Sequence, residues 1–261
     1  MTPAVTLAIG VVAVLYSAVG HAGATGYAAM MALAGLAPEV VRPTALVLNV
    51  VVAAIGTVQF ARAGHFPRGL FLPLAAASVP CAAVGGGVRL PAAVFETLLG
   101  IVLLIAAARI VLEAVRGCAA PTADADRPPP PALLGLLGAG IGLLSGLTGV
   151  GGGVFLTPVL LAIRAAPVKR VAAVTAPFIL VNSLAGLAGG MVAGGSLPPV
   201  SLPALGAVVL GGAIGSQLGA FRLPATGLRL LMAVVLLVAA GKLIGGTPPR
   251  PPAAGAKVAD R

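Results

Sequence analysis

Apolar residues fill long stretches of this chain, and polar residues fall mainly at the ends of those stretches. An apolar run of about 20 residues can cross the hydrocarbon core of a bilayer as a helix. The pattern predicts ten helical segments, five in each half of the chain. In the first half they cover residues 4–19, 26–37, 43–62, 69–88 and 92–115. In the second half they cover residues 133–147, 152–164, 168–193, 202–221 and 225–245.

The two halves of the chain resemble each other. Blocks of the first half return in the same order in the second: Ser17–Leu33 as Ser145–Leu161, Thr44–Gly56 as Thr175–Gly189, and Arg89–Pro91 as Arg222–Pro224. Order kept over several blocks indicates an internal repeat. We therefore predict two membrane repeats, residues 1–116 and 132–245. A proline-rich linker, residues 117–131, joins them, and a disordered tail, residues 246–261, follows.

Loop charge predicts how the repeats are oriented. Between the second and third segments, Glu39 and Arg42 cancel in the first half, whereas the second half is basic there, with Arg164, Lys169 and Arg170. Between the third and fourth segments the first half is basic instead, with Arg62 and Arg68. Because short basic loops stay in the cytoplasm, matching loops of the two halves face opposite sides. This predicts inverted repeats, with a cytoplasmic linker and both termini outside.

Composition strengthens the membrane interpretation. Charged residues make up 8% of the chain, against about 25% in soluble domains, and the mean hydropathy is +1.12. We predict an all-α, multi-pass protein of the bacterial cytoplasmic (inner) membrane. The net charge of +10 is carried by scattered residues, and aromatic residues are only 3%, so nucleic-acid binding is not expected.

The sequence also argues against several kinds of site. Cys81 and Cys118 do not have the spacing of metal ligands, and we predict no metal and no cofactor. Ser145 precedes a glycine, as some nucleophiles do, but no histidine follows it in the chain to act as its base. No His-Glu-x-x-His motif is present either. We therefore predict that the protein is not an enzyme.

The first two segments of each half are short, and glycines separate them. Gly149, Gly151, Gly152 and Gly153 precede the segment 152–164. Glycine inside a helix costs about 1 kcal/mol relative to alanine, and irregular backbone at membrane depth survives only when buried or lining a wet cavity. A break of this kind presents free N–H groups at a helix start, where an anion binds well. The alternative is close helix packing through small residues.

The residues around this break resemble a known family. "GLLSGLTGVGGGVFLTPVLL" followed by "VTAPFILVNSLAG" is similar to the second repeat of the TauE/SafE family of sulfite and organosulfonate exporters. The stretch from "TALVLNVVVAAIG" to "GGGVRLP" is similar to its first repeat. The resemblance implies a secondary transporter of small, sulfur-containing anions that works by alternating access. The first half departs from the pattern, with "GHAGATGYAAMM" in place of a richer glycine run followed by a proline.

Polar residues within the apolar segments complete the candidate site, because buried polar groups in a membrane need partners. The predicted substrate-binding residues are Gly149, Gly151, Gly152, Gly153, Asn182, Ser183, Thr175, His21, Gly23, Thr25, Thr44 and Asn49. His21 and Glu96 are candidates for proton coupling. The predicted partners are a small anion and the lipid bilayer, and the sequence leaves open proton or sodium coupling and a homodimer. The alternative function is a cation- or proton-coupled carrier or channel for another small solute, such as a carboxylate.

Overall fold

The computed structural model describes most of the two predicted repeats. It covers residues 2–88 except 35 and 37, and residues 129–231 except 198, 199, 225, 226, 228 and 229. The predicted segment 92–115, most of the segment 225–245, Glu96, most of the linker and the whole tail lie outside these residues. Within the described ranges every regular element is a helix, which confirms the predicted all-α fold.

Eight α-helices correspond to eight of the predicted segments. The first half contains α1 (Pro3–Ala18), α2 (Ala24–Leu33), α3 (Pro38–Arg62) and α4 (Arg68–Gly87). The second half contains α6 (Pro131–Thr148), α7 (Gly153–Ala162), α8 (Val168–Val192) and α9 (Leu202–Gln217), and a π turn, η1 (Leu218–Arg222), continues α9.

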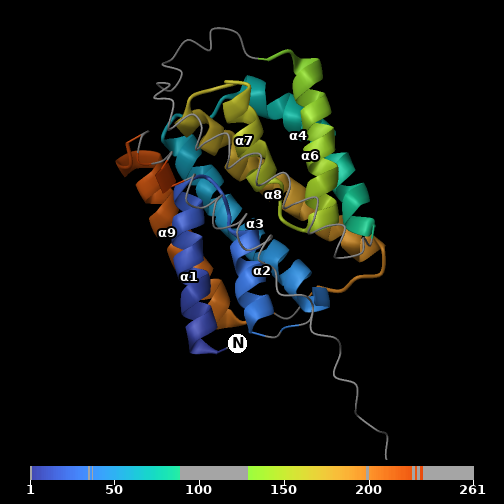
Figure 1. Cartoon of the computed structure of the whole chain (residues 1–261), viewed down its shortest axis with the longest axis vertical. Coiled ribbons are helices and arrows are strands. Elements are labelled where there is room, and N and C mark those ends of the chain that lie inside the picture. The colour runs from blue at the N-terminus through green and yellow to red at the C-terminus, as the bar shows by residue number, and fades with distance from the viewer. Residues whose placement is uncertain are drawn as a thin grey trace, which may run out of the picture.

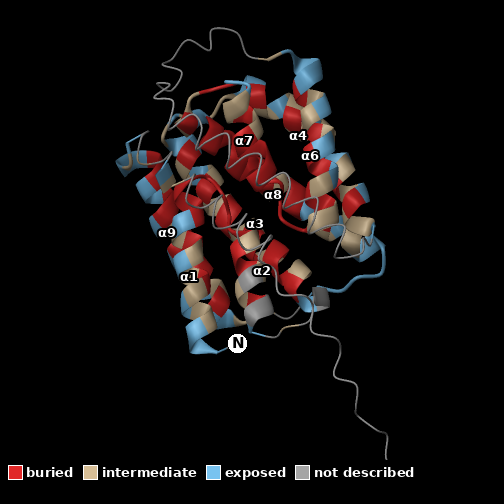
Figure 2. Cartoon of the chain, viewed as in Figure 1, coloured by how far each residue is buried: buried red, intermediate tan, exposed pale blue. Residues whose placement is uncertain are grey.

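The helices differ in length, and the predicted shortness holds for α2 and α7 but not for α6, which at 18 residues is long enough to cross a membrane. Five are long and apolar enough to cross a membrane: Val40–Arg62, Arg68–Gly87, Pro131–Thr148, Val168–Val192 and Leu202–Arg222. By contrast, α2 and α7 have 10 residues each. Ten residues rise about 15 Å, which is half of the roughly 30 Å of hydrocarbon. Apolar side chains on the outer helices are exposed, as lipid contact requires, while buried residues concentrate along α3, α7 and α8 (Figure 2).

The long helices α3 and α8 cross the middle of the molecule, with α1 and α9 on one side and α4 and α6 on the other (Figure 1). Most of these contacts have a counterpart in which the two halves are exchanged. Helix α1 packs against α9 as α6 packs against α4, and α2 packs on α3 as α7 packs on α8. Helix α1 begins at the lower end of the view and α6 at the upper end, so these equivalent helices run in opposite directions (Figure 1).

Glycines let the outer pairs approach until their backbones touch. On α6 and α9 the contact glycines recur every four residues, so each set lies along one helix face. A Cβ on any of them would overlap a backbone carbonyl oxygen of the partner helix. The α6 residues are Gly138, Gly142 and Gly146, against Leu74, Ser78 and Ala82 of α4. On the other pair, Gly211 and Gly215 of α9 and Gly219 of the π turn η1 lie against Gly10, Val14 and Ala18 of α1. We call these two sets the glycine ridges.

The basic loops of the two halves lie at the same end of the molecule. His65, in the loop between α3 and α4, has a pKa below the ordinary value, first because it is partly buried and next because the charge of Lys169 opposes its protonation. Arg170 acts in the same direction. Lys169 and Arg170 belong to the start of α8. The α3–α4 loop of one half is therefore a neighbour of the α7–α8 loop of the other.

Candidate functional site

Two glycine breaks, one in each half, contain glycines of positive φ, and the second has one more of them, Gly151, with φ of 80°. The first joins α1 to α2 and contains Gly20 and Gly23, with φ of 76° and 98°. The second joins α6 to α7 and contains Gly149 and Gly152, with φ of 70° and 79°. The first member of each pair follows the end of one helix and the second precedes the start of the next. Residues with side chains rarely adopt positive φ, so the glycines at positions 23 and 152 are conformational requirements.

The second break presents unpaired backbone donors. Within the described residues, the N–H groups of Gly151, Gly152, Gly153 and Val154 have no hydrogen-bond acceptor. The next N–H, that of Phe155, donates to the carbonyl of Gly152 over 3.1 Å. Free N–H groups of this kind belong to the first turn of any helix, and together they place about half a positive charge at the start of α7.

Asn49 connects this break to the first one. Its side chain is fully buried in the middle of α3. The amide nitrogen donates to the carbonyl of Val150 (3.3 Å) and to the hydroxyl of Ser183 (3.2 Å). The amide oxygen accepts the N–H of Ala24, the first residue of α2, over 3.1 Å. One side chain therefore holds the start of α2, the second break and α8 together.

Two further side chains next to the second break carry polar atoms with no partner among the described residues. The His21 ring lies beside the backbone of Gly153, and its Nδ1 is 3.3 Å from the carbonyl of Val19, while Nε2 has no partner. The Ser145 hydroxyl also has none, and a Cβ on Gly152 would lie 3.3 Å from its oxygen. Both residues are at least 98% buried. Buried polar atoms are almost always paired, so these two mark a place where a polar ligand can be held.

The hydrogen bonds of the other predicted site residues go elsewhere, although the methyl group of Thr175 lies against Gly153. Asn182 donates to the Ser78 hydroxyl of α4 (3.0 Å) and to the Phe178 carbonyl (2.8 Å), and its own oxygen is unpaired. Thr175 pairs with Thr157 of α7 over 3.0 Å. No hydrogen bond of the described residues joins this group to Asn49. Asn182 therefore faces α4, and Thr175 connects α7 to α8.

The threonines of the first half also bond locally. Thr44 donates to the carbonyl of Val40, one turn earlier in α3, over 2.6 Å. Thr25 donates to the Tyr16 hydroxyl over 3.3 Å. Gly23 lies against the Tyr27 ring, and a Cβ there would come within 2.9 Å of it. These three predicted residues hold the first half together in this structure.

Arg42 is a neighbour of the second break that the sequence did not single out. Its guanidinium donates to the carbonyl of Gly146, in the last turn of α6. A Cβ on Gly149 would lie 2.6 Å from Arg42 Cγ, so the side chain runs along the break. The apolar run suggested a segment starting at residue 43, which left Arg42 in a loop, whereas α3 begins at Pro38.

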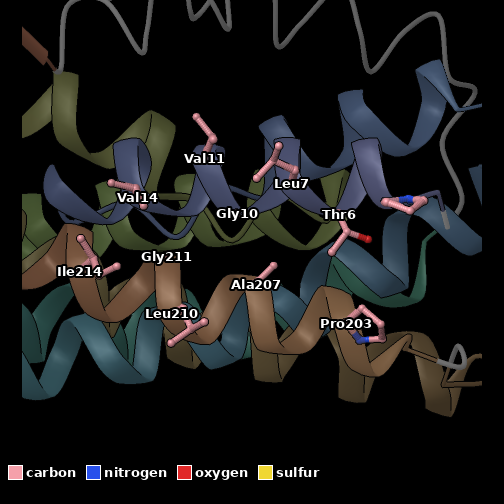
Figure 3. A pocket seen from close by; sticks show the side chains of 11 residues that line it. Thr6, Leu7, Gly10, Val11, Val14, Pro203, Ala207, Leu210, Gly211 and Ile214 are labelled. Atoms are coloured by element: carbon pink, nitrogen blue, oxygen red, sulfur yellow. The ribbon is translucent and has the colours of Figure 1, made fainter.

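The cavity in Figure 3 lies elsewhere and has a different character. It has a volume of about 550 Å³ and lies between α1 and α9. Leu7, Val11, Leu210 and Ile214 line it, and Thr6 is the one lining residue with a polar side chain. An apolar groove on the outer surface of a membrane helix pair suits lipid tails and offers an anion no charge or donor. The candidate site is therefore the second break and not this groove.

Comparison with known proteins identifies the family of this chain. The sequence profile of the family described as "Sulfite exporter TauE/SafE" matches residues 5–243. A protein of Sinorhizobium fredii named "Probable membrane transporter protein y4hK" is 42% identical over 245 residues, covering 93% of this chain and 99% of that protein. No solved structure matches.

These features define a multi-pass membrane transporter. The chain belongs to the TauE/SafE family, as its sequence had suggested. It is a transporter and not an enzyme, because the family and the relative are transporters. Together with its membrane-length helices, this membership makes it a protein of the bacterial inner membrane.

Proposed function

We propose that the protein is a secondary transporter that moves small oxyanions, sulfite or an organosulfonate first among them, by alternating access. The observation that carries this proposal is the row of N–H groups from Gly151 to Val154, which lack acceptors among the described residues. They lie where the two halves meet, beside the unpaired atoms of His21 and Ser145. Transporters of inverted-repeat design bind anions at helix starts of this kind.

The polarity of the second break favours an anion over a cation. The start of a helix carries partial positive charge, and Arg42 adds a full one close by. A helix start contributes about 0.3–2 kcal/mol to binding a negative charge. Hydrogen bonds to charged groups contribute about 1.5–3 kcal/mol each. Two or three such bonds reach the roughly 4 kcal/mol of a millimolar complex.

The alternative, a cation carrier, requires oxygen ligands at this place. Carbonyl and hydroxyl oxygens are present, but the break exposes donors, and the nearby charge has the wrong sign for a cation. The name of the family supports sulfite as the substrate and export as the direction. A carboxylate would satisfy the same donors, so the substrate test must include one.

Flux into liposomes tests the function directly. Purified protein is reconstituted, and uptake of labelled sulfite is measured alone and in competition with an organosulfonate, a small carboxylate and a neutral molecule of similar size. We expect the anions to compete and the neutral molecule not to. The current that accompanies transport should depend on the anion. A current carried by cations in the absence of any transported anion would contradict the proposal.

We also propose that the two halves are inverted in the membrane, with the linker inside and both termini outside. The exchanged helix contacts, the opposite directions of α1 and α6, and the proximity of His65 to Lys169 support this orientation. The test is cysteine labelling in a background without Cys81 and Cys118. In intact cells an impermeant thiol reagent should modify Thr2→Cys but not Ala119→Cys. Modification of the linker from outside would rule out the inversion.

A further inference from the structure

Arg42 lies apart from the other cations of the described residues. The other six lie at the end of the molecule that carries the basic loops, which we call the basic end: Arg62, Arg68, Arg164, Lys169, Arg170 and Arg222. Arg42 lies near the start of α3, 20 residues from Arg62 at the other end of the same helix. Retention of basic loops in the cytoplasm explains cations at one end of a membrane protein and does not explain this one.

The partner of Arg42 is an exposed end of helix backbone. The carbonyl of Gly146 would normally accept the N–H of Val150, four residues on, but that N–H donates to the Thr148 hydroxyl. Arg42 therefore donates to a carbonyl that the end of α6 leaves free, as basic side chains often do near a helix C-terminus. The half-buried side chain runs along Gly149, two residues before the first unpaired N–H of the break.

The guanidinium is suited to a better acceptor than a carbonyl. Its planar set of donors matches two oxygens of one carboxylate, sulfonate or similar oxyanion. Hydrogen bonds between two charged partners are about twice as strong as those between neutral ones. An oxyanion arriving at the second break can therefore replace the Gly146 carbonyl as the partner of Arg42. A monatomic anion such as chloride lacks the pair of oxygens that the fork matches.

We propose that Arg42 is the second anion contact of the transport site and that it selects oxyanions. One side of the substrate accepts the N–H groups that start at Gly151, and two of its oxygens bind the guanidinium, on the side of the break away from the basic loops. This inference rests on the proposed anion transport and adds to it a residue, a side of approach and a requirement for at least two oxygens on one face.

The first test removes the charge and keeps a donor. Arg42→Gln keeps an N–H donor but has a shorter side chain, so the thermal stability without ligand reports any loss of the α6 cap separately from the loss of anion affinity. We expect the affinity of the purified protein for sulfite, measured by calorimetry, to fall about ten- to a hundredfold, as for losing a hydrogen bond between charged groups. Thermal stability without ligand should change little. Arg62→Gln, an exposed cation at the other end of α3, is the matched control and should bind like the wild type.

The second test keeps the charge and removes the fork. Arg42→Lys should retain anion binding but lose several-fold of its preference for sulfite over chloride, measured as competition in the flux assay. It also carries the test if the glutamine variant does not fold. Wild-type affinity in Arg42→Gln, or an unchanged preference in Arg42→Lys, would show that Arg42 only caps α6. Failure of the wild type to bind any anion would instead overturn the proposed function itself.

Discussion

The two glycine breaks both place glycines of positive φ between the end of one helix and the start of the next, and they differ in the hydrogen bonds that their backbone groups make. In the first, the N–H of Ala24 is bonded to Asn49, and the Tyr27 hydroxyl donates to the carbonyl of Ala22. In the second, the equivalent N–H, that of Gly153, has no acceptor among the described residues. Counted from the starts of α2 and α7, the residue at the place of Tyr27 is Leu156, which has no hydroxyl to donate. Unpaired N–H groups remain in both breaks among the described residues, and the difference is at the helix start itself, where the N–H is bonded in the first half and free in the second.

The central helices α3 and α8 also differ at equivalent positions. Asn49 lies 11 residues after the start of α3, and the residue 11 after the start of α8 is Ile179. Ile179 lies against Gly151 and Gly153 and offers them no polar group. The first half thus supplies side chains, His21 and Asn49, to a break whose N–H groups come from the second half. The two halves therefore form a single site, to which the first half contributes side chains and the second half contributes backbone N–H groups.

The largest effect is expected at the equivalent glycines 23 and 152. Valine at either position has the same unfavourable positive φ, which costs about 1–3 kcal/mol, and meets an aromatic ring at about the same distance, 2.9 Å at Gly23 and 3.0 Å at Gly152. Gly152→Val should abolish sulfite flux and ligand-induced thermal stabilisation. Gly23→Val should lose similar stability and much less binding.

Gly206→Val is the control for this pair, because a Cβ at Gly206 meets nothing within 4 Å. Flux is compared at equal amounts of protein in the membrane. Equal loss of binding in the two break variants would mean that the breaks are not functionally different. Normal flux in Gly152→Val would assign these glycines to packing.

Asn49→Asp should have the next largest effect. The carboxylate still accepts the N–H of Ala24 but places a negative charge at the second break, where it competes with the substrate. Two like charges about 4 Å apart repel by about 4 kcal/mol at a partly screened site, so anion affinity should fall by about a thousandfold. Asn49→Ala loses the same hydrogen bonds to Val150 and Ser183 without adding charge. If both variants bind equally weakly, the charge is not the cause.

His21→Asn should have a smaller effect, confined to pH dependence. A protonated imidazole beside Gly153 attracts an anion, so wild-type sulfite flux should rise as the pH falls through the titration of His21, after correction for the ionisation of sulfite. Asparagine keeps a donor and does not titrate, so its profile should be flat and its thermal stability close to wild type. If the pH profile of flux in His21→Asn has the slope of the wild type, His21 has only a structural role.

The smallest effect is expected at the end of the molecule where the basic loops of the two halves lie. It tests whether the α3–α4 loop of one half lies beside the α7–α8 loop of the other. Lys169→Gln should raise the pKa of His65 toward its ordinary value, because the Lys169 charge holds it down. The chain has 2 histidines, so nuclear magnetic resonance of labelled histidine in the His21→Asn background follows His65 alone. Arg222→Gln serves as the comparison, since Arg222 is not among the groups that shift this pKa. An unchanged pKa of His65 would show that the two loops are not neighbours.

Much of the fold could be predicted because apolar runs and charged ends define membrane helices. The segments 69–88 and 168–193 differ from α4 and α8 by one residue at most at each end. The segment 43–62 began five residues late, because the apolar run starts after Pro43 while the helix continues through that proline from Pro38. The glycine breaks were also found from sequence, because several glycines close together in an apolar run weaken a helix at that point.

The composition of the site could be predicted only in part. Contacts such as Asn49 with Val150, or His21 with Gly153, join residues more than 100 positions apart. They depend on how α3 and α8 cross, which no local pattern encodes. The alignment of the two halves placed Asn49 and Asn182 at nearly matching positions, whereas the side chain of Asn182 faces Ser78 of α4. Ser145 was considered only as a nucleophile, and its place beside Gly152 follows from the turn of the chain after α6.

The glycine ridges have a consequence for how such a protein can move. Backbone in direct contact with backbone has no side chains to rearrange, so α6 stays with α4 and α9 with α1 unless the contact is lost altogether. A rocking motion of one intact repeat against the other would pull both pairs apart. In the alternating-access transport proposed above, the units that move would therefore each combine one helix of the first half with one of the second. A crosslink within a ridge should spare the transport cycle, and a crosslink between the two pairs should stop it.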